Sequence, residues 1–279
     1  MNDEKQRVAD FWNQAACGET LLLETARSAG YAEQARRRYE LEPFITGFAS
    51  FGAAKGLRVL EIGVGLGADH QRFAEAGAEL YGIDLTPRAI EHTSRRLAAL
   101  GLRSTLAVGD AEALPFPDGA FDMVYSWGVL HHSPNTPMAF REVFRVLKPG
   151  GSAKIMIYHT WSIVGMMLWV RYGLLRFRPW LTLQEIYGQY LESPGTKAYT
   201  RRQAKALLTG FTDIHIQTEL THGDLLSSGA GQRHQGTLLT IARFFWPRWL
   251  IRRSASGMGL FLLIEAKKPD LSGRATTAP

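Results

Sequence analysis

Short apolar runs alternate with amphipathic stretches between residues 58 and 158 of this 279-residue chain. The runs are four to six residues long and contain few polar positions, which is typical of strands buried on both faces of a sheet. They predict strands at residues 58–62, 80–83, 105–108, 121–126 and 153–158. Between them, the spacing of apolar residues predicts helices at residues 68–76, 87–100 and 136–147. This alternation predicts a parallel sheet covered by helices on both faces.

The alternation stops after residue 158, and two more apolar runs follow at residues 211–218 and 259–266. Because they close the pattern, we expect them to add antiparallel strands at one edge of the sheet. The predicted fold is a doubly wound α/β sheet of seven strands. We divide the chain into N-terminal helices at 1–50, a core at 51–158, an inserted helical cap at 159–210, edge strands with a helical insertion at 211–268, and a disordered tail at 269–279.

Composition excludes several classes of protein. Hydrophobic residues make up 46% of the chain and charged residues 21%, which excludes an intrinsically disordered protein. The single cysteine, Cys17, cannot form an internal disulfide, which favours a reducing compartment. Residues 1–12 lack the apolar region of a signal peptide, and the apolar run at 161–170 is shorter than the roughly 20 residues that span a bilayer. We therefore expect a cytoplasmic location.

The net charge of +6 is concentrated in one part of the chain, because residues 160–268 carry 14 Lys or Arg and 6 Asp or Glu. Such an excess fits nucleic acid, an anionic membrane surface or an anionic substrate. Residues 238–253 interleave aromatic side chains with arginines. Two explanations stay open for that segment: an interfacial helix on an anionic membrane, or a helix packed on the core with solvated arginines.

The candidate chemistry begins at residues 59–67, V-L-E-I-G-V-G-L-G, where a strand runs into Gly63, Gly65 and Gly67. Glycines at this point let the backbone turn sharply and approach a ligand closely. In an open α/β sheet, ligands bind at the carboxyl ends of the strands. Asp84 follows Gly63 by 21 residues, as an acid that binds a ribose would. This element alone leaves open a nicotinamide cofactor or another cofactor that contains adenosine.

Three later motifs narrow the choice: G-D-A-E-A-L-P-F-P-D-G-A-F-D at 109–122, V-Y-S-W-G-V-L-H-H at 124–132, and L-K-P-G-G at 147–151. With the glycine motif and I-D-L at 83–85, they resemble the class I S-adenosylmethionine-dependent methyltransferases. The similarity is greatest to the small-molecule branch with the ubiquinone and menaquinone C-methyltransferases (methyltransferase type 11). The resemblance covers about residues 56–158. It implies a Rossmann-like fold and S-adenosyl-L-methionine as the cofactor.

The resemblance also implies roles for individual residues. Glu61 would face the methionine part of the cofactor, Asp84 the ribose hydroxyls, and Asp110 the adenine edge. The alternative is that such acids are helix N-caps and turn residues. The full set expected to contact the cofactor is Glu61, Gly63, Gly65, Gly67, Asp84, Leu85, Asp110, Ala111, Ser126, Trp127, Trp12 and Tyr39.

Methyl transfer from a sulfonium is an in-line displacement that depends mainly on orientation. A general base is needed only when the acceptor loses a proton. The candidates are His131 and His132 after the fourth strand, and Tyr158 and His159 at the end of the fifth, although each histidine could instead be structural. We expect no metal, because adjacent histidines lack the i, i+4 spacing of a helical ligand pair and the chain has no cysteine cluster.

The acceptor side is predicted from the cap. Lys197 and Tyr199 follow a Pro-Gly turn that resembles a lid, and Lys197 and Arg201 could bind an anionic group. Alternatively these cations are solvated and Thr200 is the N-cap of a helix at 201–209. Trp161 and other apolar cap residues suggest an acceptor pocket. We therefore expect a small, partly apolar organic acceptor, with an anionic group as one option, of the kind found in secondary metabolism.

Two alternatives remain beside this function: a lipid or quinone methyltransferase at a membrane surface, and a protein that binds S-adenosylmethionine or NAD without methyl transfer. Peripheral membrane contact is therefore an open option. A nucleic-acid substrate is disfavoured, because residues 126–129 read S-W-G-V. The sequence lacks at this place the N/D-P-P-Y/F tetrad whose presence would resemble the amino-methylating enzymes of that class. The oligomeric state is left open.

Overall fold

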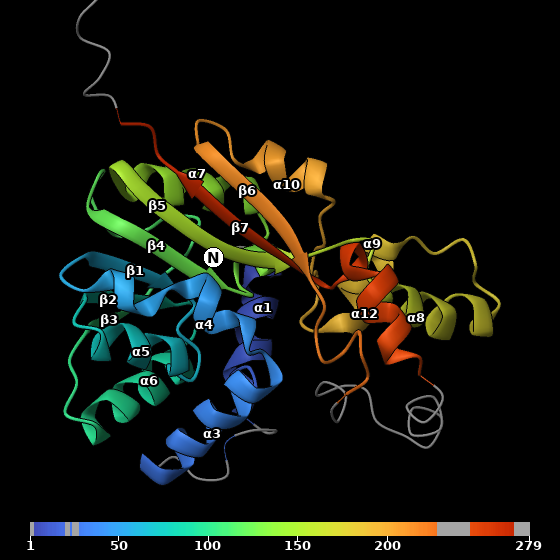
Figure 1. Ribbon diagram of the computed structural model, residues 1–279, viewed down its shortest axis with the longest axis horizontal. Helices are drawn as coiled ribbons and strands as arrows, with labels where there is room; N and C mark the ends of the chain where they lie inside the picture. The colour runs from blue at the N-terminus through green and yellow to red at the C-terminus, as the bar shows by residue number, and fades with distance from the viewer. Residues whose placement is uncertain (1–2, 20–22, 24–27, 228–245, 271–279) are drawn as a thin grey trace, which may run out of the picture.

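A mixed sheet of seven strands forms the centre of the protein (Figure 1). The computed structural model describes residues 3–19, 23, 28–227 and 246–270. The strands, in their spatial order, are β3 (Thr105–Val108), β2 (Glu79–Asp84), β1 (Arg58–Ile62), β4 (Phe121–Trp127), β5 (Leu147–Tyr158), β7 (Phe261–Lys267) and β6 (Thr212–Glu219). Strands β1 to β5 pair in parallel, and β7 pairs antiparallel with both β5 and β6. The predicted doubly wound fold with antiparallel pairing at one edge is confirmed.

Most predicted element bounds agree with the structure to within one or two residues, and β5 is the exception. It begins at Leu147 rather than at residue 153. Pro149, Gly150 and Gly151 predict a loop, yet Gly150 adopts a φ of 78° and its N–H donates to the carbonyl of Lys268 at 2.9 Å. The pairing of Leu147 with Phe121 of β4 and the hydrogen bonds of Gly150 and Gly151 with Lys268 therefore extend β5 through a sequence that ordinarily breaks strands.

Helices and short helical turns surround the sheet. Those before and within the core are α1 (Asp3–Gln14), α3 (Ser28–Leu41), α4 (Phe44–Ala49), η1 (Phe51–Ala54), α5 (Ala68–Glu75), α6 (Pro87–Ala99), η2 (Leu130–His132) and α7 (Thr136–Val146). Those after the core are α8 (Ile163–Tyr172), η3 (Leu174–Arg176), α9 (Leu183–Ile186), η4 (Tyr187–Leu191), α10 (Arg201–Leu207), α12 (Arg248–Ser254) and η5 (Ser256–Met258).

Local signals begin several of these helices where the sequence predicts. Thr86 caps α6 by accepting a hydrogen bond from the N–H of Ala89. Thr200 caps α10 in a capping box with Gln203, which confirms the alternative that Thr200 begins a helix. The helical insertion predicted between the apolar runs at 211–218 and 259–266 is described only in part: α12 lies within it, whereas residues 228–245 lie outside the described residues. Residues 271–279 of the predicted tail also lie outside them.

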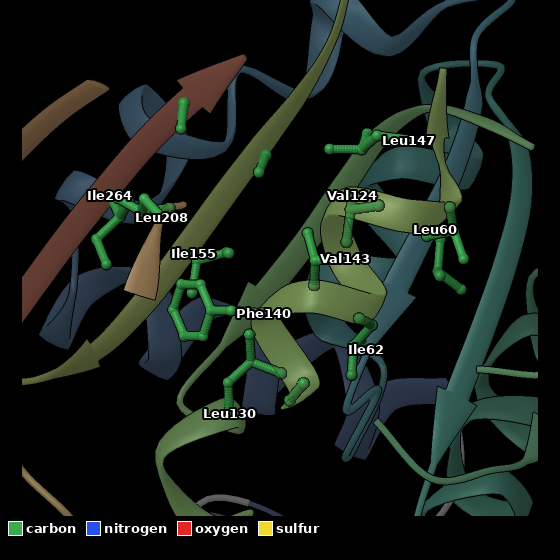
Figure 2. Close-up of a cluster of buried hydrophobic side chains, with 14 of the residues drawn as sticks. Leu60, Ile62, Val124, Leu130, Phe140, Val143, Leu147, Ile155, Leu208 and Ile264 are labelled. Carbon is green, nitrogen blue, oxygen red and sulfur yellow. The ribbon is translucent and has the colours of Figure 1, made fainter. Parts of the chain in front are cut away.

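Side chains that alternate along the strands divide the core into two clusters. On one face, Leu60 and Ile62 of β1 pack with Phe140 and Val143 of α7 (Figure 2). On the other face, Val59 of β1 packs in a cluster that includes residues from α4, α5, α8 and α9. This alternation directs Glu61 to the second face, beside the helices that enclose the site. Among the described residues, no helix is both long and apolar enough to cross a membrane.

Truncation of Phe140 tests the first cluster. Phe140 is fully buried, so Phe140→Ala leaves a cavity and is expected to lower the free energy of unfolding by about 3–5 kcal/mol. Phe177, which is 87% exposed, provides the matched control, and Phe177→Ala should change the free energy of unfolding by less than about 0.5 kcal/mol. Urea unfolding followed by circular dichroism measures both, and equal losses would contradict the placement of Phe140.

Candidate functional site

One large cavity lies at the carboxyl ends of the strands, between the core and the cap. Its volume is about 1330 Å³. The core side is lined by the loop after β1 and by the ends of β2 and β4. The cap side is lined by α8, by residues around η4 and by α12, and α1 and α3 contribute from the N-terminal segment. The position agrees with the rule that open α/β sheets bind ligands beyond the carboxyl ends of their strands.

The loop after β1 brings backbone atoms to the cavity wall. Gly63 has a φ of 83°, and a Cβ there would lie 2.1 Å from Cγ2 of Val129, so no other residue fits without displacing Val129. The Gly63 N–H donates to the carbonyl of Ile83 at 2.7 Å, which ties the end of β1 to β2. Gly65 and Gly67 also have positive φ values, of 52° and 74°. The turn therefore exposes backbone, rather than side chains, to a ligand.

Glu61 is the acid at the end of β1 and is buried beside the cavity. Its Oε2 lies 2.8 Å from Nδ1 of His70, whose Nε2 lies 2.8 Å from the Ser104 hydroxyl. Burial raises the pKa of the Glu61 carboxyl well above its usual range and lowers the pKa of His70 to about 3. A cation beside Glu61 would favour its ionised form. This carboxyl is therefore placed to respond to a positively charged ligand.

A second buried group joins the N-terminal helices to α5. Asp69 accepts hydrogen bonds from Arg38 at 2.7 Å, from the Tyr39 hydroxyl at 2.9 Å and from the Tyr125 hydroxyl at 2.8 Å. Arg38 thereby keeps the pKa of Asp69 below its usual value despite the desolvation that would raise it. Arg38 and Asp69 line the cavity, whereas Tyr39 does not. Tyr39 holds α3 in place and touches the cavity only through Asp69.

Asp84 lies where β2 ends, and its carboxylate is held by the surrounding backbone. Oδ2 accepts from the Gly65 N–H at 3.2 Å, and Oδ1 accepts from the N–H and the hydroxyl of Thr86 at 3.0 and 2.9 Å. Burial raises its pKa, and these hydrogen bonds oppose that effect. Asp84 and the adjacent Leu85 both line the cavity. Asp84 thus has a fixed orientation with part of its surface turned to the ligand space.

Ion pairs hold helix α1 over the end of β3. Nζ of Lys5 lies 2.5 Å from Asp110 and 2.7 Å from Glu112. Trp12, from the same helix, lines the cavity, with its ring centroid 5.4 Å from that of His132. The N-terminal helix therefore closes the cavity above Asp110.

A cluster of polar side chains stands between the two halves of the cavity. His132, Tyr158 and Glu192 all line it. The Tyr158 hydroxyl donates to Oε2 of Glu192 at 2.6 Å, and Nε2 of His132 lies 3.4 Å from the same oxygen. Nδ1 of His132 is held by the hydroxyls of Ser193 and Thr196 at 2.8 and 3.1 Å. The imidazole is thus fixed in orientation with one nitrogen facing a carboxylate.

Comparison with known proteins agrees with this geometry. Residues 60–155 match the family described as methyltransferase domain. An uncharacterized protein of Mycobacterium tuberculosis is 33% identical over 43% of this chain and 44% of its own length. A sterol 24-C-methyltransferase of Aspergillus fumigatus is 30% identical over 50% of this chain and 45% of its own. A 2-methyl-6-phytyl-1,4-hydroquinone methyltransferase of Synechocystis is 34% identical over 38% of this chain and 33% of its own length. This chain thus spans less than half the length of these curated relatives.

Solved structures share the fold at low sequence identity. Phosphoethanolamine N-methyltransferase 2 of Haemonchus contortus superposes with a TM-score of 0.58 and 22% identity, over 94% of this chain and 60% of the other. An S-adenosylmethionine-dependent methyltransferase of Mesorhizobium loti superposes with a TM-score of 0.54 and 20% identity, over 80% of this chain and 97% of the other. Residues 60–155 thus match a methyltransferase domain, in agreement with the predicted class I S-adenosylmethionine-dependent family. The predicted family, fold and cofactor, S-adenosylmethionine, are confirmed.

Ten of the twelve residues expected to contact the cofactor line the cavity of this methyltransferase domain, and Tyr39 and Ser126 do not. The Ser126 hydroxyl donates to the carbonyl of Ile62 at 3.1 Å, so it links β4 to β1. Both residues belong to the support of the site. The Tyr39 hydroxyl is bound by Asp69 and the Ser126 hydroxyl by the carbonyl of Ile62, so neither side chain lines the ligand space.

Two of the four candidate bases also fall outside the cavity lining. His131 is fully buried, its ring centroid lies 4.0 Å from that of Tyr158, and burial lowers its pKa well below the usual value. His159 is buried with Nδ1 3.2 Å from the carbonyl of Gly259. His131, His132 and Glu192 nevertheless offer three potential metal-ligand atoms within 4.8 Å of one another, although adjacent histidines alone predict no such site.

The residues predicted for the acceptor, Lys197, Tyr199, Arg201 and Trp161, do not line the cavity. Nζ of Lys197 donates to the carbonyl of Ser133 at 2.9 Å, and Arg201 donates to the Thr218 hydroxyl at 2.9 Å. Tyr199 pairs through its backbone with Tyr158, and Trp161 is 59% exposed. The capping role of Thr200 turns α10 and its cations away from the cavity.

The cavity lining contains polar residues that the motifs did not identify. They include Arg38, Glu42 and Glu192. Glu192 precedes the Ser-Pro-Gly-Thr turn of the cap, which is the signal that could have indicated it. Glu42 and Arg38 come from the N-terminal segment, where no sequence pattern distinguishes a residue of the site from one on the surface.

Glu42 gives a pH-dependent prediction. It lies 3.5 Å from Arg38, and burial raises its pKa from 4.5 to about 7. Between those values the unfolded chain releases this proton and the folded chain keeps it, so stability falls as pH rises through this window. Glu42→Gln should therefore raise the free energy of unfolding by roughly 1–3 kcal/mol at pH 8 and change it little at pH 4.

Urea unfolding at pH 4 and pH 8 measures the effect. Glu40→Gln, which removes an exposed carboxyl from α3, is the control. A gain of the same size at both pH values would contradict the buried, protonated state of Glu42.

Proposed function

We propose that this protein transfers a methyl group from S-adenosylmethionine to a small, largely apolar organic acceptor. The single observation that carries the proposal is the continuous cavity, which joins the strand ends of the domain to an apolar chamber in the cap. Its volume of about 1330 Å³ exceeds the roughly 300–1,000 Å³ of a pocket for one small ligand. One cavity of this size has room for a cofactor and an acceptor together.

The core half of the cavity fits the cofactor. Glycine at position 63 keeps the backbone clear of side chains, and Glu61, Asp84 and Asp110 stand at three successive strand ends. We assign the methionine part to Glu61 and the Gly63–Gly67 loop, the ribose to Asp84, and the adenine to Asp110 and Ala111. When bound, S-adenosylmethionine supplies an electrophilic methyl group on a cationic sulfonium. Acids suit such a ligand because it carries positive charge and hydroxyl donors.

The cap half of the cavity fits an apolar acceptor. Its walls contain apolar side chains from α8, η4, α12, η5, β7 and the residue before β7: Ile163, Met166, Met167, Leu168, Leu191, Ile251, Met258, Leu260 and Phe261. Flexible methionines adapt to irregular apolar shapes. Arg171 is the cation at the outer end of this half, so an anionic group on the acceptor would lie there rather than at Lys197 or Arg201.

His132 and Glu192 are placed to remove a proton from the acceptor. The Glu192 carboxylate accepts the proton from the acceptor and passes it to Nε2 of His132, 3.4 Å away, while Tyr158 holds that carboxylate in place. Trp12 and α1 exclude water from the same space. This arrangement favours an acceptor with an acidic O–H or C–H, such as a phenol or hydroquinone. The similarity to a hydroquinone methyltransferase supports this choice. We also propose that the acceptor is a secondary metabolite and that its methylation takes place in the cytoplasm.

Asp84 tests the cofactor half. Asp84→Asn replaces a charged acceptor of hydrogen bonds by a neutral one, so the dissociation constant for S-adenosylhomocysteine should rise about 10- to 100-fold. Asp118→Asn, which alters an exposed acid paired with Arg145, is the matched control and should leave it unchanged. Isothermal titration calorimetry measures both. Stabilisation of the wild-type protein by NAD instead of S-adenosylhomocysteine in a thermal-shift assay would refute the assignment.

Glu192 tests the proton transfer. With an accepted member of a panel of alkyl-substituted phenols and hydroquinones, Glu192→Gln should lower kcat about 100-fold while S-adenosylhomocysteine binds as before. Glu185→Gln, in the exposed capping box of α9, serves as the control. Turnover that EDTA abolishes and zinc restores would assign His131, His132 and Glu192 to a metal instead.

A further inference from the structure

Exposed apolar side chains gather on one part of the surface. Eleven large apolar side chains are exposed among the described residues, and nine of them lie at residues 161–180 and 246–258. We call the surface of these two segments the cap face. Phe177, Trp180 and Trp249 are 87%, 70% and 71% exposed. The other six are Trp161, Met166, Val170, Leu174, Leu175 and Leu250. A patch with this many exposed aromatic groups marks an interaction site.

The cap face is also strongly cationic. Its two segments contain six arginines and no aspartate or glutamate: Arg171, Arg176, Arg178, Arg248, Arg252 and Arg253. The guanidinium groups of Arg171 and Arg176 lie 5.3 and 5.1 Å from the ring of Tyr172. The positive charge that distinguishes the C-terminal part of the sequence is therefore placed among exposed aromatic side chains.

The cap face surrounds one end of the cavity. Helices α8 and α12 both carry it, and both lie at the end of the molecule away from β2 and β3 (Figure 1). Met166, Val170, Arg171 and Leu175 are exposed on this face and also line the cavity. Ile251 of α12 lines the same cavity. An apolar molecule that lies against the cap face is therefore next to the acceptor half of the cavity.

We propose that the cap face binds the surface of an anionic lipid bilayer and that the apolar acceptor enters the cavity from it. Exposed tryptophan and phenylalanine insert at the headgroup level, and arginines pair with anionic headgroups, as in interfacial helices. A second copy of the chain fits less well, because a symmetric dimer through this face would oppose six arginines to six arginines with no acid between them. The entry route rests on the proposed function, but the membrane contact does not.

Co-sedimentation with lipid vesicles tests the contact without cofactor or acceptor. The full chain should sediment with vesicles of phosphatidylcholine containing 30% phosphatidylglycerol, but not with phosphatidylcholine alone, and 0.5 M salt should release it. Arg176→Gln with Arg178→Gln should lower the partition constant on the order of 30-fold, because each cation near an anionic surface contributes about fivefold. Phe177→Ser with Trp180→Ser should lower it at least tenfold.

Matched variants and a second measurement separate the outcomes. Arg202→Gln with Lys205→Gln removes the same charge from the exposed face of α10 and should leave sedimentation nearly unchanged. Both cap-face variants should bind S-adenosylhomocysteine like the wild type, since none of the four residues lines the cavity. The proposal is overturned if the wild type stays in solution with anionic vesicles, or if the α10 variant loses as much binding as the arginine variant. It is also overturned if size-exclusion chromatography shows a dimer that Phe177→Ser with Trp180→Ser dissociates. Failure of S-adenosylhomocysteine binding in the wild type would instead refute the proposed function.

Discussion

The close contact between the β1 loop and the segment after β4 is the constraint on which the site depends. Gly63 takes a left-handed conformation directly beneath Val129, where a Cβ would overlap the valine side chain. Because of this contact, β1 can end beside β2 and β4, and the acids Glu61 and Asp84 reach the same cavity. The glycine therefore determines more than a local turn: it sets the distance between the backbone and whatever occupies the core half of the cavity.

Burial of charge is the cost of placing acids in this way, and the structure offsets it with partners from distant segments. Asp69 is satisfied by Arg38 and two tyrosines, and Asp110 by Lys5. Both cations come from the N-terminal helices, so the ion pairs that stabilise the acids of the site also hold these helices to the domain. Closure of the cavity and stability of its charged groups thus depend on the same contacts.

The sheet and the core half of the site could be predicted from the sequence because they follow local rules. Short apolar runs and helical spacing locate the strands and the helices of the core, and strand-end positions identify acids such as Asp84 and Asp110. The cap half could not be predicted in this way. Tyr199 and Arg201 belong to a motif that resembles a lid, yet a capping box at Thr200 and strand-like pairing with Tyr158 turn them away from the cavity. Glu192 lies a few residues earlier, directly before the turn of the cap, and its position opposite His132 shows its importance.

The sequence by itself determined the order of strands and helices, the family of the domain and the excess of positive charge after residue 160. These properties depend on residues close together in the chain, or on composition alone. Only the tertiary structure decided that Arg38, Glu42 and Glu192 share one cavity and that the arginines of the cap stand among exposed aromatic groups. Such groupings arise from contacts between segments far apart in sequence, where no periodicity links the positions and burial, rather than residue type, decides what each side chain can do.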